Sequence, residues 1–590
     1  MSPIRRGLNK VKNLLSKEQT HILETAFILM LPVILSKIFG QIFQLLLAST
    51  YGLDDSRLNQ FFIANAIPEL LTTVLMVGAV GTVTIPILIS VKKKEDEEHF
   101  YRIYSSIINV TLLLFSIIGA FLILFADKLI PLAISLTGTE IPPSDIELNN
   151  IVWMMRAMVI PQFILGVSVF ISTGLNVYDR YLLPQLSPLF FNLGRTIAFV
   201  LLFGLLDKSP WAIVAGTYVG AILHLVIQIP LFLHLKIKYY FYINLQDKNI
   251  REMFKLGIPR IAVLASDHIG LLINNFISLA FIAGPAALNF AKSLYLLIPS
   301  LFGYTFSYAS YPTLARMFSE GENEKIRKIT CKTLQEIFFM SLPFIITLLV
   351  LRVPIVRLTY GILPNTSFSL QDTYQVAWLM LFFSFGLAFI TARWFLFSLF
   401  YASKDTITPS LVSIGSLISV VAFSVLFTNL LSHTPDFDFT KIQWSIENLF
   451  NRSPNPNRVG VGGIAMSMSF VYTIEFFVML YLFNRNKIKL GLKSFFIKLF
   501  DKLLASSVML CVMYIIYKVW DKVSYAFPDT ADYTYSGSTT VNLFILTVVT
   551  VVPGFMVYYL ISYLLRVEEL KILRRYLNPI FKIGGLKINK

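Results

Sequence analysis

Long apolar runs recur along the whole chain, separated by short polar segments. A helix satisfies its own backbone hydrogen bonds where no water is available, and roughly 20 apolar residues cover the hydrocarbon core of a bilayer. The pattern therefore predicts an all-α polytopic membrane protein with about fourteen transmembrane helices. The predicted spans are 22–49, 59–90, 104–126, 150–177, 184–205, 211–233, 257–283, 288–315, 333–357, 375–401, 409–430, 459–483, 494–517 and 541–565.

Basic residues lie mainly on one side of this array. With the N-terminus placed in the cytoplasm, the cytoplasmic segments hold 33 Lys and Arg residues and the opposite loops hold 8. This asymmetry predicts a multi-pass protein with both termini cytoplasmic. The net charge of +16 would then face anionic membrane lipids, so we expect lipids as partners and no nucleic acid.

Enzyme chemistry has little support in the sequence. The two cysteines, Cys331 and Cys511, are far apart, the six histidines form no HExxH pair, and no Walker A motif is present. We therefore expect no catalytic residues, no metal site, no bound cofactor and no enzymatic activity.

The two halves of the chain resemble each other at a nearly constant offset. The turn 175–184 ends in Pro184, and the turn 400–409 has the same layout 225 residues later. Prolines at two further pairs of positions keep almost the same offset: Pro32 with Pro259, and Pro86 with Pro312. The repeat predicts two six-helix pseudo-symmetric lobes plus two C-terminal helices. The expected parts are a cytoplasmic N-terminus 1–20, an N-lobe 21–235, a cytoplasmic linker 236–256, a C-lobe 257–485, helices thirteen and fourteen in 486–566, and a basic cytoplasmic tail 567–590.

Several predicted spans carry ionisable residues near their middle. Charges inside a membrane helix are costly and tend to face a bundle interior or a wet cavity, so each is a candidate site residue. Cations outnumber acids, which favours an anionic substrate. A structural role is also open for Lys37, as the partner of Glu24 or Glu69, and for Arg260, as the partner of Asp267 seven residues later on the same helix face. It is open as well for Lys292, whose ammonium could snorkel outward, and for Arg195 and Arg393. The set is Glu24, Lys37, Glu69, Arg156, Arg195, Arg260, Asp267, His268, Lys292, Arg393 and Glu475.

Four segments carry more specific patterns: 61–71 with Gly78, Ala79 and Pro86; 174–181 with Pro184, Pro188 and Asn192; 289–295 with Pro299 and Gly303; and 400–406 with Thr408 and Pro409. They resemble the second helix, the turn between helices four and five, the eighth helix, and the turn between helices ten and eleven of the MurJ (MviN) family. These lipid II flippases belong to the multidrug/oligosaccharidyl-lipid/polysaccharide exporter superfamily. The resemblance covers most of residues 22–485.

The resemblance implies a V-shaped, two-lobed bundle with a central cationic cavity in the cytoplasmic membrane. It implies alternating-access movement of a polyprenyl-pyrophosphate-linked saccharide, with the peptidoglycan precursor lipid II as the expected substrate. It also implies a hydrophobic groove beside the last two helices, coupling to a monovalent cation or the membrane potential, and cell-wall synthesis proteins as partners. On this basis we expect Lys37, Arg260 and Lys292 to contact the diphosphate, with Arg156 as a further contact.

The chain departs from the family pattern in the first helix. The family's Arg-x-x-Gly-x-x-Arg-Asp reads Lys37-Ile-Phe-Gly40-Gln-Ile-Phe43-Gln44, and the eighth-helix Arg is Lys292. Lysine is a point charge without the bidentate fork of arginine. Other functions therefore stay open: another polysaccharide-unit exporter, a drug/cation antiporter, which the cationic surplus disfavours, a non-transporting membrane scaffold with a decayed cavity, or a membrane-embedded transferase, which the lack of a convergent acidic or His motif disfavours.

Overall fold

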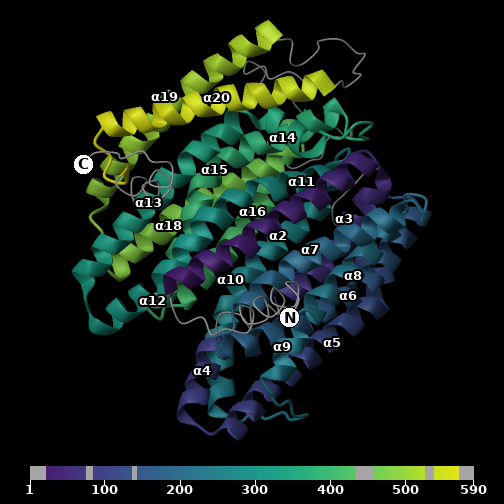
Figure 1. Ribbon diagram of the computed structural model, residues 1–590, viewed down its shortest axis with the longest axis vertical. Helices are drawn as coiled ribbons and strands as arrows, with labels where there is room; N and C mark the ends of the chain where they lie inside the picture. The colour runs from purple at the N-terminus through teal and green to yellow at the C-terminus, as the bar shows by residue number, and fades with distance from the viewer. Residues whose placement is uncertain (1–21, 75–83, 136–142, 434–457, 525–536, 571–590) are drawn as a thin grey trace, which may run out of the picture. The chain divides into compact units, whose positions relative to one another are not determined.

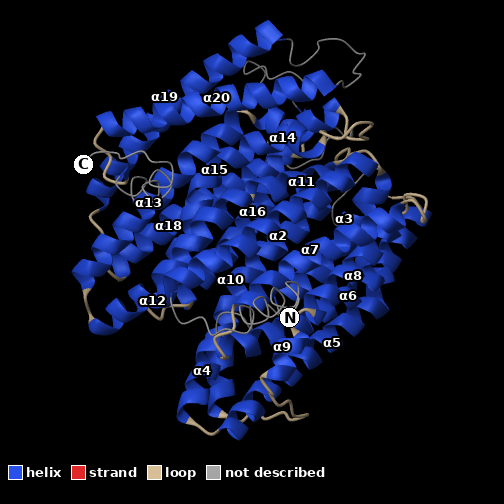
Figure 2. Cartoon of the chain, viewed as in Figure 1, coloured by secondary structure: helices blue, strands red, loops and turns tan. Residues whose placement is uncertain are grey.

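The computed structural model describes residues 22–74, 84–135, 143–433, 458–524 and 537–570, and within them every regular element is a helix (Figures 1 and 2). Contacts divide the chain into two compact units. Unit 1 contains residues 1–286 and 452–458, and unit 2 contains 287–451 and 459–590. The predicted N-terminal segment 1–20, most of the loop 431–458 and most of the tail 567–590 lie outside the described residues.

Unit 1 contains nine helices in its described part: α2 (Ile22–Tyr51), α3 (Ser56–Thr72), α4 (Ile85–Lys94), α5 (Glu97–Ser135), α6 (Asp145–Val177), α7 (Leu182–Phe203), α8 (Trp211–Val226), α9 (Ile229–His234) and α10 (Lys248–Ser278). Small residues bring two of them close together. A Cβ atom on Gly194 of α7 would lie 3.1 Å from the Gly220 Cα of α8, and one on Gly216 would lie 2.8 Å from the Arg195 carbonyl oxygen. The glycines thus let the α7 and α8 backbones approach, as small residues do between membrane helices.

Unit 2 holds the remaining described helices, with α11 beginning just before its boundary: α11 (Gly284–Tyr295), the π-helix η2 (Pro299–Tyr304), α12 (Thr305–Glu320), α13 (Asn323–Val350), α14 (Arg352–Tyr360), α15 (Leu370–Ala402), α16 (Ile407–His433), α18 (Gly462–Asn486), α19 (Leu492–Ser524) and α20 (Gly537–Leu564). Its centre is formed by α15 and α18, which pack on each other and on α13 and α16. A Cβ atom on Gly386 of α15 would lie 2.6 Å from the Ser469 Cα of α18, so glycine is what permits this contact.

In the described part of the chain, 12 helices are long and apolar enough to cross a membrane, or 13 if the bent pair α11 with η2–α12 is one span. The predicted second span, 59–90, corresponds to α3 and α4, and residues 75–83 between them lie outside the description. The all-helical membrane fold is therefore confirmed, while the count of fourteen stays a prediction. The seventh predicted span corresponds to α10, which packs against α3, α4 and α5 of unit 1.

The two turns singled out by the repeat have the same backbone geometry. After α6, Asp179 has φ of 56° and the Arg180 N–H donates to the Leu175 carbonyl at 3.0 Å. After α15, Lys404 has φ of 61° and the Asp405 N–H donates to the Phe400 carbonyl at 3.0 Å. Both are Schellman caps with a left-handed residue in the same place, although neither uses glycine there. The repeat therefore predicts the local geometry correctly at this pair of turns.

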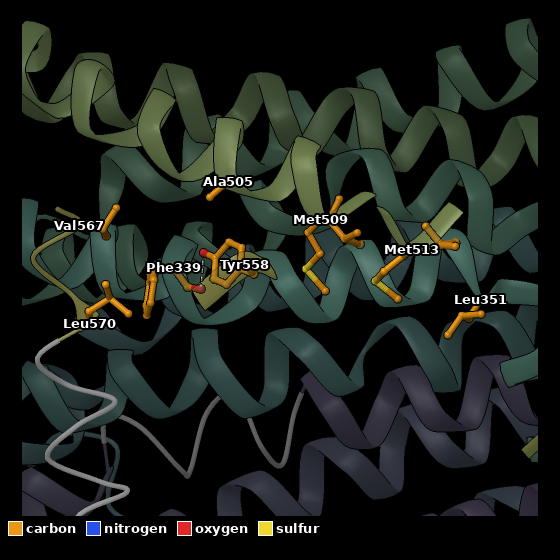
Figure 3. Close-up of a cluster of buried hydrophobic side chains, with 10 residues drawn as sticks. Phe339, Leu351, Ala505, Met509, Met513, Tyr558, Val567 and Leu570 are labelled. Carbon is orange, nitrogen blue, oxygen red and sulfur yellow. Dashed lines mark hydrogen bonds between the residues drawn. The ribbon is translucent and has the colours of Figure 1, made fainter. Parts of the chain in front are cut away.

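The last two helices, α19 and α20, lie side by side and pack on α13 and α14 (Figure 1). Their apolar contact includes Met509 and Met513 of α19, and the Tyr558 hydroxyl of α20 donates to the Phe339 carbonyl of α13 at 2.9 Å (Figure 3). At one end of this contact the buried Lys502 ammonium donates to Gln335 of α13 at 2.7 Å. It also pairs with Glu569, just past α20, at 3.1 Å. Three separate segments are thus joined by one buried lysine.

Candidate functional site

The first helix, α2, carries a polar stripe within its apolar sequence. Lys37, Gln41 and Gln44 are spaced i, i+4 and i+7, so they share one helix face. The Lys37 side chain is exposed, and among the described residues it makes no hydrogen bond and no ion pair. The alternative that Lys37 pairs with Glu69 is therefore not what the structure shows. The side chain of Glu24, the other alternative partner, lies outside the description. An ammonium with no acceptor among the described residues is available to an anion.

Helix α7 fixes the part of α2 that bears this lysine. The Asn192 side-chain amide donates to the Ser36 carbonyl at 2.9 Å and to its hydroxyl at 3.0 Å. Gly40 lies beside this side chain, and a Cβ there would lie 3.6 Å from the Asn192 amide nitrogen, an ordinary van der Waals distance. The asparagine therefore holds α2 against α7 one residue away from Lys37.

Arg195 of α7 lies on aromatic rings. Its guanidinium carbon is 4.1 Å from the ring centre of Phe43 and 5.1 Å from that of Phe191. Glu69 of α3 attracts it electrostatically. Yet, within the residues described, Arg195 has neither a hydrogen bond nor an ion pair through its side chain. Phe43 occupies the position at which the family pattern has its second cation. The Arg195 guanidinium of α7 therefore places a positive charge beside this position of α2.

A polar network joins α3 to α6 in the same unit. The Thr72 hydroxyl donates to Gln162 at 2.8 Å, and the Gln162 amide donates to Asn65 at 3.5 Å. The Asn65 amide in turn donates to the Glu69 carboxylate at 3.0 Å. The network thus connects the buried Gln162 to Glu69, the residue that attracts Arg195. Asn65, four residues before Glu69 on α3, orients the Glu69 carboxylate.

Arg156 of α6 is held by the neighbouring helix α5. Its Nε donates to the Ile123 carbonyl at 2.9 Å, and it pairs with Asp127 at 3.4 Å. Its guanidinium carbon also lies 5.0 Å from the Trp153 ring centre. These contacts give Arg156 a structural role between α5 and α6, and a substrate contact would have to compete with them.

Arg260 lies on α10, the long helix that Asp247 caps by accepting from the Asn249 N–H at 2.8 Å. It is partly buried and lies one residue after Pro259, the proline that the repeat pairs with Pro32. Lys37, Arg156 and Arg260 thus belong to unit 1.

Lys292 belongs to unit 2 and lies on α11, whose neighbouring side chains anchor it. The Tyr360 hydroxyl of α14 donates to the Phe290 carbonyl at 2.9 Å and lies 2.5 Å from the Ser293 hydroxyl. Tyr295 stacks on Phe383 of α15, with ring centres 4.1 Å apart. Lys292 itself is partly buried. The helix that carries it is therefore held on α14 and α15 independently of the lysine.

Arg393 of α15 and Glu475 of α18 form a buried ion pair in unit 2. Their side chains are 3% and 0% exposed, and the closest nitrogen and oxygen atoms are 2.5 Å apart. The Ser413 hydroxyl of α16 donates to the second carboxylate oxygen at 3.0 Å. The Arg393 guanidinium carbon also lies 4.1 Å from the Tyr472 ring centre. These contacts support the structural interpretation of Arg393.

The sequence could list these charges but not pair them. Neither the contact of Asn192 with Ser36 nor that of Ser413 with Glu475 has a signal in the sequence, because each joins residues that only packing brings together. Among the described residues no group of three His, Cys, Asp or Glu side chains could hold a metal ion.

Comparisons with known proteins give a consistent result. The family model described as "Lipid II flippase MurJ" matches residues 48–434. The chain is similar to proteins named "Probable lipid II flippase MurJ" from Buchnera aphidicola subsp. Acyrthosiphon pisum, at 25% identity over 82% of this chain and 88% of that one. The relative of that name from Thermotoga maritima is 27% identical over 92% of this chain and 96% of that one.

Two solved structures share the fold. One is described as lipid II flippase MurJ in an inward closed conformation, with a TM-score of 0.66, 18% identity, and coverage of 90% of this chain and 99% of that one. The other is an inward-facing multidrug resistance MATE family transporter of the MOP superfamily, with a TM-score of 0.56, 12% identity, and coverage of 76% and 93%. At these identities the likeness concerns the fold alone.

Proposed function

Because this chain belongs to the lipid II flippase MurJ family, we propose that it moves a polyprenyl-pyrophosphate-linked saccharide, with lipid II as the substrate, across the cytoplasmic membrane. The family match covers residues 48–434, and relatives of that name align with most of the chain. A transporter of this kind binds and releases its cargo unchanged, so the protein is a carrier rather than an enzyme.

One observation supports this function most directly: Lys37 lies in a membrane helix, exposed and without an acceptor among the described residues. A charge at this depth persists where it faces a bundle interior or a wet cavity. A diphosphate accepts strong, charge-assisted hydrogen bonds from lysine and arginine. The lysine therefore has the chemistry that an anionic headgroup requires.

The proposed binding residues are Lys37, Arg260 and Lys292, with Arg156 as a further contact. Each contact between a charged donor and the diphosphate would contribute roughly 1.5–3 kcal/mol, hence about 10- to 150-fold in affinity. Arg156 already pairs with Asp127 at 3.4 Å, so the diphosphate would have to compete with that carboxylate. We therefore assign it the smallest contribution to substrate affinity.

The proposed arrangement has both termini in the cytoplasm, as the loop charges predict. Movement by alternating access requires a driving force, and we propose coupling to a monovalent cation or to the membrane potential. Membrane lipids and cell-wall synthesis proteins are the expected partners. The lobes 21–235 and 257–485 are the proposed moving parts.

The experiment is complementation of a bacterial strain depleted of its own lipid II flippase. The wild-type chain should restore growth, and Lys37→Ala and Lys292→Ala should not, although both variants should reach the membrane. Lys292→Arg should restore growth, because it keeps the charge and presents the planar, bidentate fork of N–H donors.

Lys498→Ala serves as the matched control, since the Lys498 ammonium forms a surface pair with Glu568, with side chains 47% and 70% exposed. That variant should complement fully. Normal growth with both Lys37→Ala and Lys292→Ala would exclude the proposed cationic site.

A further inference from the structure

Two arginines inside the membrane helices have the same aromatic surroundings. The Arg195 guanidinium carbon lies 4.1 and 5.1 Å from the ring centres of Phe43 and Phe191. That of Arg393 lies 4.1 and 5.2 Å from those of Tyr472 and Phe397. In both cases the planar cation rests on ring faces, an arrangement that favours the charged form.

The two arginines differ in what their N–H groups bind. Arg393 pairs with the Glu475 carboxylate at 2.5 Å. Arg195, as far as the described residues show, donates no side-chain hydrogen bond and forms no ion pair. Arginine does not lose its proton in proteins, so the Arg195 charge cannot be removed by neutralisation. A charge inside the membrane is expensive unless a partner compensates it, and the described residues supply the two rings and the attraction of Glu69.

The scaffold holds Arg195 in place without any help from a ligand. Gly216 of α8 lets that helix approach the Arg195 backbone, since a Cβ there would lie 2.8 Å from its carbonyl oxygen. On the other side, Phe43 packs edge-on against Phe199, with ring centres 5.9 Å apart. The backbone and the supporting ring are both fixed, so the guanidinium is oriented in advance.

Arg195 lies close to Lys37 along the helix axes. The Asn192 amide donates to the Ser36 carbonyl, so Asn192 and Ser36 lie at the same height along the packed helices α2 and α7. Lys37 is one residue beyond Ser36 and Arg195 is three beyond Asn192. At 1.5 Å of rise per residue, the Cα atoms of Lys37 and Arg195 differ by roughly 3 Å in height, less than one helical turn.

From these observations we propose that Arg195 is a further substrate-binding residue that donates to the diphosphate which Lys37 also binds. This assignment rests on the proposed function. A guanidinium presents a planar fork of N–H donors that matches a phosphate group, and here its fork carries no protein acceptor among the described residues. Arg195 and Lys37 would then supply two positive charges from two adjacent helices of the same unit.

The test measures binding of undecaprenyl diphosphate, which carries no sugar and no carboxylate, to the purified full-length protein in detergent. Arg195→Met should weaken this binding about 10- to 150-fold, the range for loss of a charged hydrogen bond. The affinity of Arg195→Lys should lie between those of the wild type and Arg195→Met, because an ammonium keeps the charge but lacks the planar fork of N–H donors. The control is Arg102→Met, which removes an exposed arginine paired with Glu98 at 2.6 Å and should leave binding unchanged.

Thermal unfolding without ligand separates binding from a structural role. Removing Arg195, which has no hydrogen-bonded or ion-paired partner among the described residues, should lower the melting temperature less than removing the paired Arg393. Equal diphosphate binding by the wild type and Arg195→Met would overturn the assignment, as would a melting temperature of Arg195→Met that falls as far as that of Arg393→Met. If the wild type itself binds no diphosphate, the proposed function fails and the assignment fails with it.

Discussion

The buried pair between Arg393 and Glu475 makes the strongest stability prediction. Arg393→Met removes the cation that faces the Glu475 carboxylate, which is 0% exposed and also accepts a hydrogen bond from the Ser413 hydroxyl. An uncompensated buried charge costs about 3–5 kcal/mol. We expect Arg393→Met to lose free energy of unfolding in that range. Glu475→Gln should lose less, because its amide keeps hydrogen-bonding capacity.

The double variant Arg393→Met with Glu475→Leu distinguishes charge from packing. Replacing a buried pair by apolar side chains of similar size is often neutral or stabilising. Ser413 can then return its hydroxyl to a carbonyl of its own helix. We therefore expect the double variant to recover most of the stability that Arg393→Met loses.

Denaturant unfolding of the purified protein in detergent measures these differences, and the fluorescence of Trp394, next to Arg393 in the chain, provides a local probe. Lys498→Ala is again the control and should unfold like the wild type. The reasoning is refuted if Arg393→Met is as stable as the wild type. It is also refuted if the double variant loses as much as the two single variants together.

Two further predictions concern unit 2. Burial alone would raise the pKa of Asp405, but its hydrogen bonds with Thr408 and the ammonium of Lys487 outweigh this and hold the pKa below its usual value. The stability that the Asp405 carboxylate contributes is therefore complete above about pH 4 and is lost as the pH falls through the lowered pKa. Asp405→Asn should flatten the pH dependence of the free energy of unfolding in that range. An Asp405→Asn variant that loses stability at acid pH as the wild type does would contradict this. Gly386→Ala should destabilise the protein by about 1–3 kcal/mol in the same unfolding assay, because its Cβ would lie 2.6 Å from the Ser469 Cα. A variant as stable as the wild type would contradict this, since α15 and α18 would then move apart without loss of stability.

The fold could be predicted from the sequence to a large extent, because membrane helices depend on local composition. The apolar runs locate the described spans, and the turns at 175–184 and 400–409 share a Schellman cap. Helix ends were less predictable: the third span, expected at 104–126, corresponds to α5 from Glu97 to Ser135. Amphipathic turns continue a helix beyond the hydrocarbon core, and hydropathy does not detect them.

The roles of individual charges were harder to predict, because they depend on which helix faces meet. Arg393 and Arg195 are alike in sequence terms, since each is a single cation in an apolar span. Only packing shows that Glu475 faces Arg393, 82 residues away, while Arg195 meets the Phe43 ring. The prediction of a cationic surplus thus pointed to an anionic substrate without separating the paired charges from those available for binding.

The proposed transport activity is tested most directly by leaflet transfer in vesicles. The purified protein is placed in liposomes that contain lipid II, a membrane potential is applied, and the lipid II accessible on the far leaflet is measured with time. We predict transfer by the wild type, little transfer by Lys37→Ala, and wild-type transfer by Lys498→Ala. No transfer by the wild type, or equal rates for the wild type and Lys37→Ala, would contradict the account.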